Sequence, residues 1–167
     1  NTQFIIFAYD EIFFAKVEGQ LRQAFVQAGL PTEQLSTSPW LGREYYQYLM
    51  MQSTLLLDSF GFSGINTVMQ ALEVGLPVVT LRGDLLCGRL GSGVLDAAGL
   101  ADVVAETKDD YIKLATQLIQ NNAQRDVYRQ RIFAAHDVLF ENDACIDETF
   151  TLFREMVQAQ FVPVEQD

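Results

Sequence analysis

The chain has 167 residues, of which 49% are hydrophobic, and this length fits one domain with a sizeable core. Asp and Glu number 22 against 11 Lys and Arg, so the net charge of -11 would repel a polyanion and excludes DNA or RNA as a partner. No apolar run approaches the roughly 18 to 20 residues of a membrane span, and no signal peptide is visible. We therefore expect a cytoplasmic protein without a membrane span.

Short apolar runs alternate with amphipathic helical patterns along the chain. The runs with the length of strands cover residues 4–7, 34–38, 54–58, 78–81 and 102–105. The patterns with helical spacing cover residues 17–28, 42–52, 65–72, 89–98, 107–118, 123–139 and 146–161. This alternation predicts an α/β fold with a Rossmann-like parallel sheet flanked by helices, and extra helices at the C-terminus. We expect one domain over residues 1–162 and a frayed tail over residues 163–167.

Two helix ends and one helix face are also predicted by particular residues. Thr107, with Asp110 three residues later, is typical of a capped helix start. Gly75 marks the end of the helix that covers residues 65–72. On the last helix, apolar residues recur at helical spacing and predict a packing face: Phe150, Phe153, Val157 and Phe161.

Three loops follow predicted strands and are the expected places for a ligand, because parallel sheets bind ligands beyond the carboxyl ends of their strands. They cover residues 38–43, 59–65 and 82–88. The middle loop leads from a strand to a helix start, where the first amides have no intrahelical acceptor and carry partial positive charge. Gly64 lets the backbone approach a ligand closely, which predicts a phosphate-binding turn. The spacing is neither G-x-G-x-x-G nor a P-loop, so an ordinary loop capped by Ser63 remains the alternative.

The sequence LDSFGFSGINT at residues 57–67, followed by QALEVGLPVVTLRG at residues 70–83 and by Arg89, carries a family resemblance. It resembles the UDP-sugar-binding domain of O-GlcNAc-transferase-like glycosyltransferases, especially bacterial members with tetratricopeptide repeats. The upstream sequence SPWL at residues 38–41, with Arg43 and Tyr46, is similar to the preceding family segment. The resemblance implies the C-terminal domain of a two-domain GT-B architecture.

The resemblance also assigns positions to the UDP-sugar, all of them in the first two loops or the elements that follow. For the diphosphate they are Ser63, Gly64, Ile65, Asn66, Thr67 and Arg43, for the ribose Gln70, and beside the base and phosphates Trp40 and Tyr46. Gln70 departs from the Glu or Asp usual in relatives, and Ile65 from the histidine of the animal enzymes. Arg82 is expected either to meet a phosphate or to be a solvated loop charge, and Arg89 either to bind the ligand or to form a salt bridge.

The chain begins with Asn1 rather than Met, which we interpret as a piece of a longer protein. In the family, a first strand-helix unit with a phosphate-binding lysine, and the N-terminal GT-B domain that faces the acceptor, precede this point. We therefore expect no catalytic residue in this fragment and no activity of the fragment alone.

The resemblance implies an inverting transfer of a sugar, GlcNAc or a hexose, from a UDP-sugar to a protein acceptor, without a cofactor or metal. Cys87 and Cys145 have no metal or redox spacing, and the lone His136 lies in a helical run. One alternative is a sugar-nucleotide epimerase of the same architecture. Another is a noncatalytic Rossmann-like interaction module that has lost nucleotide binding, which the departures at Ile65 and Gln70 favour.

Overall fold

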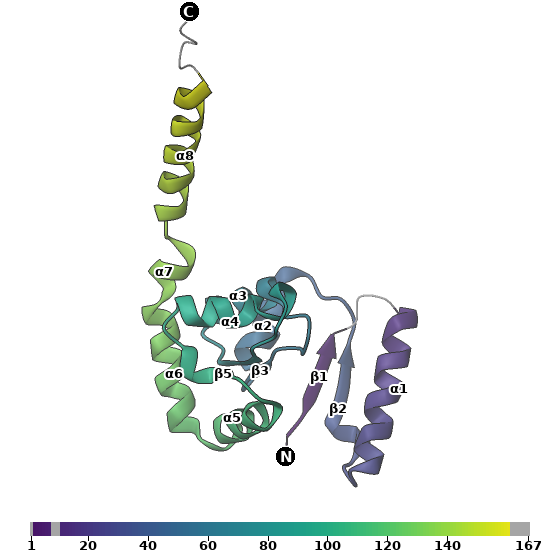
Figure 1. The fold of residues 1–167 in the computed structure, drawn as a ribbon. Helices are drawn as coiled ribbons and strands as arrows, with labels where there is room; N and C mark the ends of the chain where they lie inside the picture. The colour runs from purple at the N-terminus through teal and green to yellow at the C-terminus, as the bar shows by residue number, and fades with distance from the viewer. Residues whose placement is uncertain (1, 8–10, 161–167) are drawn as a thin grey trace, which may run out of the picture. The chain divides into compact units, whose positions relative to one another are not determined.

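The computed structural model describes residues 2–7 and 11–160 and divides the chain into two compact units, Asn1–Leu49 and Met50–Asp167 (Figure 1). The strands are β1 Phe4–Phe7, β2 Leu35–Ser38, β3 Leu56–Leu57, β4 Val78–Leu81 and β5 Val104–Ala105. The helices are α1 Glu11–Gln27, α2 Arg43–Gln52, α3 Ile65–Glu73, α4 Leu90–Ala97, α5 Lys108–Gln120, α6 Asn122–Ala134, α7 His136–Phe140 and α8 Ala144–Gln160. Short 3-10 turns cover Thr32–Gln34, Leu86–Gly88 and Ala101–Val103.

The first unit is a β-α-β arrangement followed by the start of α2. β1 and β2 pair in parallel, with Phe4 opposite Leu35, and α1 lies between them in the chain. Gly29 ends α1 in the left-handed region at φ 68°, a conformation that glycine adopts without strain. The ring of Phe4 packs edge-on against Phe25 of α1 at 5.6 Å, so the helix is held on this sheet by aromatic contact.

The second unit contains a three-stranded parallel sheet in the order β3-β4-β5. Leu56 pairs with Val78, and Thr80 pairs with Val104. Figure 1 shows α3 and α4 above these strands and α5 below them. The core includes ten hydrophobic residues that are 1% exposed or less: Val68, Ala71, Leu72, Val78, Val79, Leu95, Leu100, Ala105, Leu118 and Ile132. Each valine, leucine or isoleucine side chain among them contributes roughly 1.5–3 kcal/mol by leaving water, so this core is the main support for the loops at the strand ends.

The predicted α/β fold with parallel strands and flanking helices is confirmed, and several element bounds differ. The predicted strand at 54–58 forms a ladder only over Leu56–Leu57, because its outer residues continue into loops. The predicted helix at 123–139 is divided into α6 and α7 at Ala135, whose backbone is not helical at φ -94° and ψ 1°. The parallel strands form two sheets, one in each unit. The expectation of a single domain stays a prediction, and residues 163–167 lie outside the described residues.

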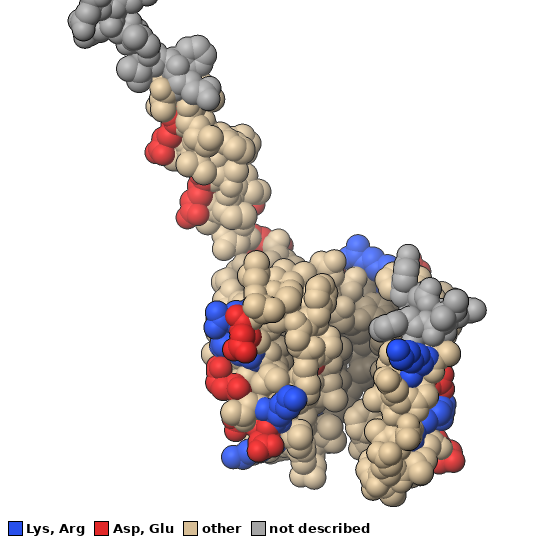
Figure 2. All heavy atoms as spheres, turned by 45° about the vertical axis from the view of Figure 1, so that its right-hand side comes forward, with Lys and Arg blue, Asp and Glu red and all other residues tan. Residues whose placement is uncertain are grey.

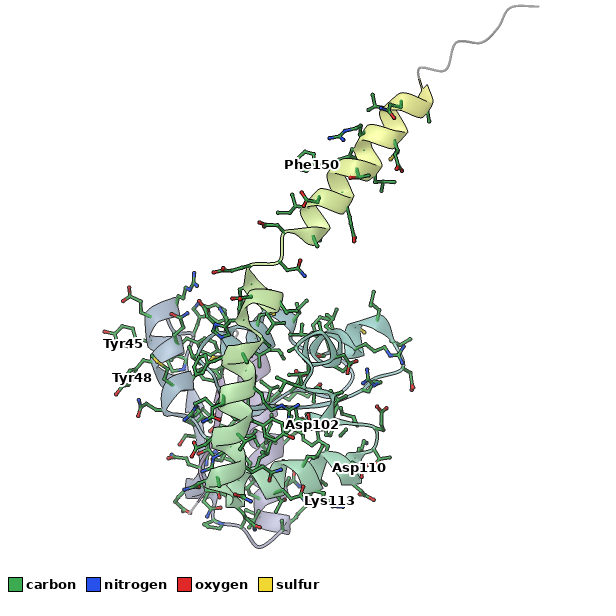
Figure 3. All side chains as sticks on the ribbon, turned by 90° about the vertical axis from the view of Figure 1, so that its left-hand side faces the viewer. Tyr45, Tyr48, Asp102, Asp110, Lys113 and Phe150 are labelled. Carbon is green, nitrogen blue, oxygen red and sulfur yellow. The ribbon has the colours of Figure 1, made fainter. Side chains whose placement is uncertain are left out.

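The last helix, α8, carries the predicted apolar stripe on an exposed surface. Phe150, Phe153 and Val157 are 65%, 57% and 55% exposed, and Phe161 lies outside the described residues. Figure 2 shows a largely uncharged surface along this helix, and Figure 3 shows Phe150 projecting from it. The expected packing is therefore absent from the part of the chain that the structure describes.

No helix within residues 2–7 and 11–160 combines the length and the apolar character that crossing a lipid bilayer requires.

Candidate functional site

Asp58 follows β3 and is held through its backbone by two neighbouring elements. Its N–H donates to the carbonyl of Val79 in β4 at 3.0 Å. Its carbonyl accepts a hydrogen bond from the hydroxyl of Tyr111 in α5 at 2.9 Å. Burial raises the pKa of Tyr111, and the charge of Asp58 raises it further, so this hydroxyl remains a donor at neutral pH. The starting point of the 59–64 loop is thereby fixed to the sheet.

Asp58 is 7% exposed, and its carboxylate accepts four hydrogen bonds. Oδ1 accepts from the backbone N–H of Ser59 at 3.0 Å and of Gly64 at 3.1 Å. Oδ2 accepts from the hydroxyls of Ser63 and Thr80, the latter at 2.7 Å. A buried carboxylate is tolerated only when such bonds replace its hydration, and here all of them come from the loop or from β4.

Ser63 connects the 59–64 loop to the loop before α4. Its N–H donates to the carbonyl of Cys87 at 2.8 Å, and its Oγ accepts from the N–H of Gly91 at 2.7 Å. The side chain of Ser63 is 1% exposed, with its hydroxyl donated to Asp58. Two of the three predicted loops, at 59–65 and 82–88, therefore lie side by side. The predicted place of Ser63 in the diphosphate set stays a prediction, and its hydroxyl is engaged within the protein.

The start of α3 presents backbone amides to the surface. Gly64 is its N-cap, at φ -91° and ψ 90°, and the N–H of Val68 donates to the Gly64 carbonyl at 2.9 Å in the first turn. Within the described ranges, the amides of Ile65, Asn66 and Thr67 have no hydrogen-bond acceptor. Ile65 and Asn66 are exposed and Thr67 is half-buried. Three successive unpaired amides at a positive helix end form a suitable binding place for an anion.

Gln70 lies one helical turn further along α3 and is half-buried. It follows Asn66 by four residues and Thr67 by three, so it shares their side of the helix. The opposite side of α3 is buried through Val68 and Leu72. The structure thus brings Asn66, Thr67 and Gln70 together on one partly exposed face beside the 59–64 loop.

The two arginines near the third loop differ in their partners. Arg82 donates to both carboxylate oxygens of Asp96, at 2.8 and 3.1 Å, and to Glu106 at 2.9 Å. The hydrogen bond from Arg82 lowers the pKa of Asp96, as expected for a bidentate charged pair. Arg89 precedes α4, is exposed, and forms no ion pair with any residue that the structure describes. Of the two, Arg89 is the cation available to a ligand.

The predicted residues Trp40, Arg43 and Tyr46 belong to the first unit. Trp40 is 72% exposed between β2 and α2, and Arg43 is the first residue of α2. The ring of Tyr46 packs edge-on against Phe7 of β1 at 4.8 Å. Each unit is described by itself, so the participation of these three residues in the same site stays a prediction.

The lone histidine packs within the protein, and the two cysteines are not joined in a disulfide. Nε2 of His136 hydrogen-bonds the carbonyl of Leu72 at 3.1 Å, and its ring packs edge-on against Phe133 and Phe140. Cys87 and Cys145 are free thiols. Among the described residues, no three His, Cys, Asp or Glu side chains are grouped so as to hold a metal ion.

Sequence reasoning identified the amides of α3 but did not identify the residues behind them. Thr80, Gly91 and Tyr111 contact Asp58 or Ser63 from positions that are 22, 28 and 53 residues away in the chain. Sequence spacing contains no signal for such contacts. The only available sign was a polar residue, Asp58, at the end of an apolar strand.

Comparison with known proteins identifies the family. The model of glycosyl transferase family 41 matches residues 10–146. The probable UDP-N-acetylglucosamine–peptide N-acetylglucosaminyltransferase SPINDLY of Eustoma exaltatum subsp. russellianum is 33% identical over 105 residues, which are 59% of this chain and 11% of that protein. The UDP-N-acetylglucosamine–peptide N-acetylglucosaminyltransferase of Caenorhabditis elegans is 28% identical over 101 residues, 60% of this chain and 9% of that protein.

A solved structure agrees with these sequence matches. A mutant of the Thermobaculum terrenum O-GlcNAc transferase superposes with a TM-score of 0.80 at 25% identity, over 92% of this chain and 30% of that one. The chain spans about a tenth of the length of the curated relatives named above. The family model covers most of the chain, and the fold agrees with that of a bacterial O-GlcNAc transferase, so this chain belongs to glycosyl transferase family 41.

Proposed function

We propose that this chain is the UDP-sugar-binding part of an inverting glycosyltransferase that transfers GlcNAc or a hexose to a protein acceptor. The observation that carries the proposal is the row of unpaired amides at Ile65, Asn66 and Thr67, in a chain of glycosyl transferase family 41. Family membership supports the reaction class, and the amides support the position of the diphosphate. A cytoplasmic location is part of the same proposal.

The chemical role of the α3 start is to stabilise the charge that develops on the leaving diphosphate. Amides fixed in place before the reaction, together with the positive helix end, act most strongly where charge appears during bond cleavage. The side chains of Asn66 and Thr67 add donors beside these amides. This arrangement supports transfer without a metal or cofactor, which is part of the proposal.

The remaining predicted residues complete the proposed site. Gln70 hydrogen-bonds the ribose hydroxyls as a neutral amide, without the charge-assisted strength of the carboxylate usual in relatives. Trp40 and Tyr46 lie along the base, and Arg43 supplies a cation to the diphosphate. We propose that the catalytic base and the acceptor-binding residues belong to the N-terminal GT-B domain, so that this chain alone does not transfer the sugar.

A second candidate function is a noncatalytic interaction module of the same fold. It is favoured by Ile65, an exposed apolar residue where the animal enzymes have histidine, and by Gln70. This reading predicts no affinity for UDP in any form of the protein.

The test is titration of UDP by isothermal calorimetry into this chain and into the full-length gene product, each with an Asn66→Ala variant. The matched control is Asn122→Ala, which truncates an exposed asparagine in the first turn of α6. UDP binding that is weakened by Asn66→Ala and unchanged by Asn122→Ala supports the proposal. Binding by the full-length protein alone also supports it and shows that further segments complete the site. Absence of binding by both overturns it in favour of the interaction module.

A further inference from the structure

We infer that Asp58 is a positioning residue for the UDP-sugar: through Ser63 and Gly64 it holds the 59–64 loop so that the amides of Ile65–Thr67 face the diphosphate. The inference rests on the proposed function, because it assigns to Asp58 a part in binding UDP without any contact with UDP. It is carried by the four hydrogen bonds that the carboxylate of Asp58 accepts, in a residue that is 7% exposed.

Oδ1 of Asp58 closes the loop on itself. It accepts from the N–H of Ser59, the first loop residue, at 3.0 Å, and from the N–H of Gly64, the last one, at 3.1 Å. Gly64 is also the N-cap of α3. The direction in which α3 presents its first amides therefore follows from the position of this one oxygen.

Oδ2 of Asp58 connects the closed loop to the rest of the second unit. It accepts from Thr80, a residue of β4 that is 0% exposed and therefore a fixed point, at 2.7 Å. It also accepts from Ser63, whose Oγ in turn accepts from the N–H of Gly91 in α4 at 2.7 Å. The loop is thus held between the sheet and the first turn of α4.

A direct contact between Asp58 and the diphosphate is disfavoured on electrostatic grounds. A second negative charge close to a diphosphate opposes binding by Coulomb repulsion. All four hydrogen bonds of the carboxylate run to the loop and to β4, and its side chain is buried behind the α3 start. The role that this geometry allows is to fix the loop in the conformation that exposes the amides.

The experiment compares UDP affinity with thermal stability in the full-length protein for two single variants, their double variant and one control. Asp58→Asn keeps the shape of the side chain but provides one acceptor oxygen instead of two, and Ser63→Ala removes the hydroxyl that joins Asp58 to Gly91. The matched control is Asp102→Asn. The Asp102 carboxylate likewise accepts hydrogen bonds, from the side chains of Tyr128 and Arg131, but Asp102 precedes β5 and therefore lies at the opposite end of the strands from their carboxyl ends.

We expect Asp58→Asn and Ser63→Ala each to weaken UDP binding about tenfold, the effect of losing one hydrogen bond to a charged group. Two independent effects would together weaken UDP binding about hundredfold. The double variant should lose much less affinity than that, because both substitutions break the same hydrogen bond between Ser63 and Asp58. Asp102→Asn should lower the midpoint of thermal unfolding and leave UDP affinity unchanged.

Three results would overturn the inference. If Asn66→Ala weakens UDP binding but Asp58→Asn and Ser63→Ala do not, Asp58 has no positioning role and the proposed function stands. If Asp102→Asn loses UDP affinity in the same proportion to its lost stability, the role of Asp58 is merely structural. If the wild-type protein binds no UDP, the proposed function and this inference both fail.

Discussion

The backbone N–H of Gly91 donates to Oγ of Ser63 at 2.7 Å, although the two residues are 28 positions apart in the chain. This bond brings the first turn of α4 against the loop that precedes α3. The approach is so close that a Cβ built on Gly91 would lie 2.5 Å from Oγ of Ser63 and 2.6 Å from Oδ2 of Asp58. The packing of α4 on the candidate site therefore depends on glycine at this position.

Gly91→Ala should destabilise the protein by about 1–3 kcal/mol, the usual cost of forcing an extra carbon into a packed site. Gly93→Ala is the matched control, because Gly93 is in the same helix and a Cβ there meets nothing within 4 Å. An exposed helical glycine replaced by alanine should instead gain about 0.5–1 kcal/mol. Urea unfolding of both variants measures the difference, and equal midpoints would contradict the close approach of Gly91 to Ser63 and Asp58.

Arg82 and Arg89 should respond differently when each is replaced by glutamine. Arg89→Gln should weaken UDP binding severalfold and reduce its dependence on salt, since Arg89 is exposed beside the candidate site without an ion pair among the described residues. Arg82→Gln should leave UDP affinity unchanged and lower stability by less than about 1 kcal/mol, because its pairs with Asp96 and Glu106 are partly exposed. Calorimetry at two salt concentrations tests both expectations, and the reverse pattern would show that Arg82 leaves its partners to meet the phosphates.

The pairing of Arg131 with Asp102 predicts a contribution to stability that acid removes. The hydrogen bonds from Arg131, and then from Tyr128, hold the pKa of Asp102 below its ordinary value of 3.8. Below that value the unfolded chain binds the proton more readily than the folded one, so stability is present at higher pH and is lost as the pH falls. Arg131→Gln should therefore flatten the decline of the unfolding free energy as the pH falls below about 4.

Arg129→Gln is the control for this decline in the unfolding free energy at low pH. Arg129 is in the same helix, and its carboxylate partner Asp126 lies at 4.0 Å. The variant should keep the steep decline of the wild type. Urea unfolding at a series of pH values gives the unfolding free energy of all three proteins. The same decline at low pH in wild type and Arg131→Gln would contradict a stabilising pair between Arg131 and Asp102.

Tyr128 should contribute stability that is lost in alkaline solution. Burial, and the hydrogen bond to Asp102, raise the pKa of Tyr128 to about 12 from its ordinary value of 10.0. The folded protein keeps the proton that the unfolded chain releases, so this stability is complete below about pH 10 and disappears as the pH rises toward 12. Tyr128→Phe should flatten this loss of stability at high pH. Tyr48→Phe is the control and should not, because Tyr48 is 60% exposed. Urea unfolding across this pH range measures the unfolding free energy, and an unchanged loss of stability in Tyr128→Phe would refute the prediction.

The parts of the fold that local sequence determines were predictable. Thr107 accepts from the N–H of Asp110 at 3.1 Å, as its position before the helical pattern indicated. Gly75 follows α3 with φ 73°, as expected of a glycine that ends a helix. The unpaired amides after Gly64 were predicted as well, since every helix start leaves its first N–H groups without an intrahelical partner. These features depend on neighbouring residues and on the 3.6-residue period alone.

Contacts between distant elements could be learned only from the tertiary structure. The partners of Arg82 became clear when α4 and β5 placed Asp96 and Glu106 beside it, because a cation on a loop pairs with whichever carboxylates the fold brings near. The part played by Asp58 depended in the same way on Thr80 and Tyr111, from a neighbouring strand and a covering helix. Sequence by itself determined the parallel α/β fold, the family and the helix start with unpaired amides, because these reside in local pattern and motif. Tertiary structure decided which polar groups are already engaged, because hydrogen bonds act over about 3 Å and partners at that distance need not be near in sequence.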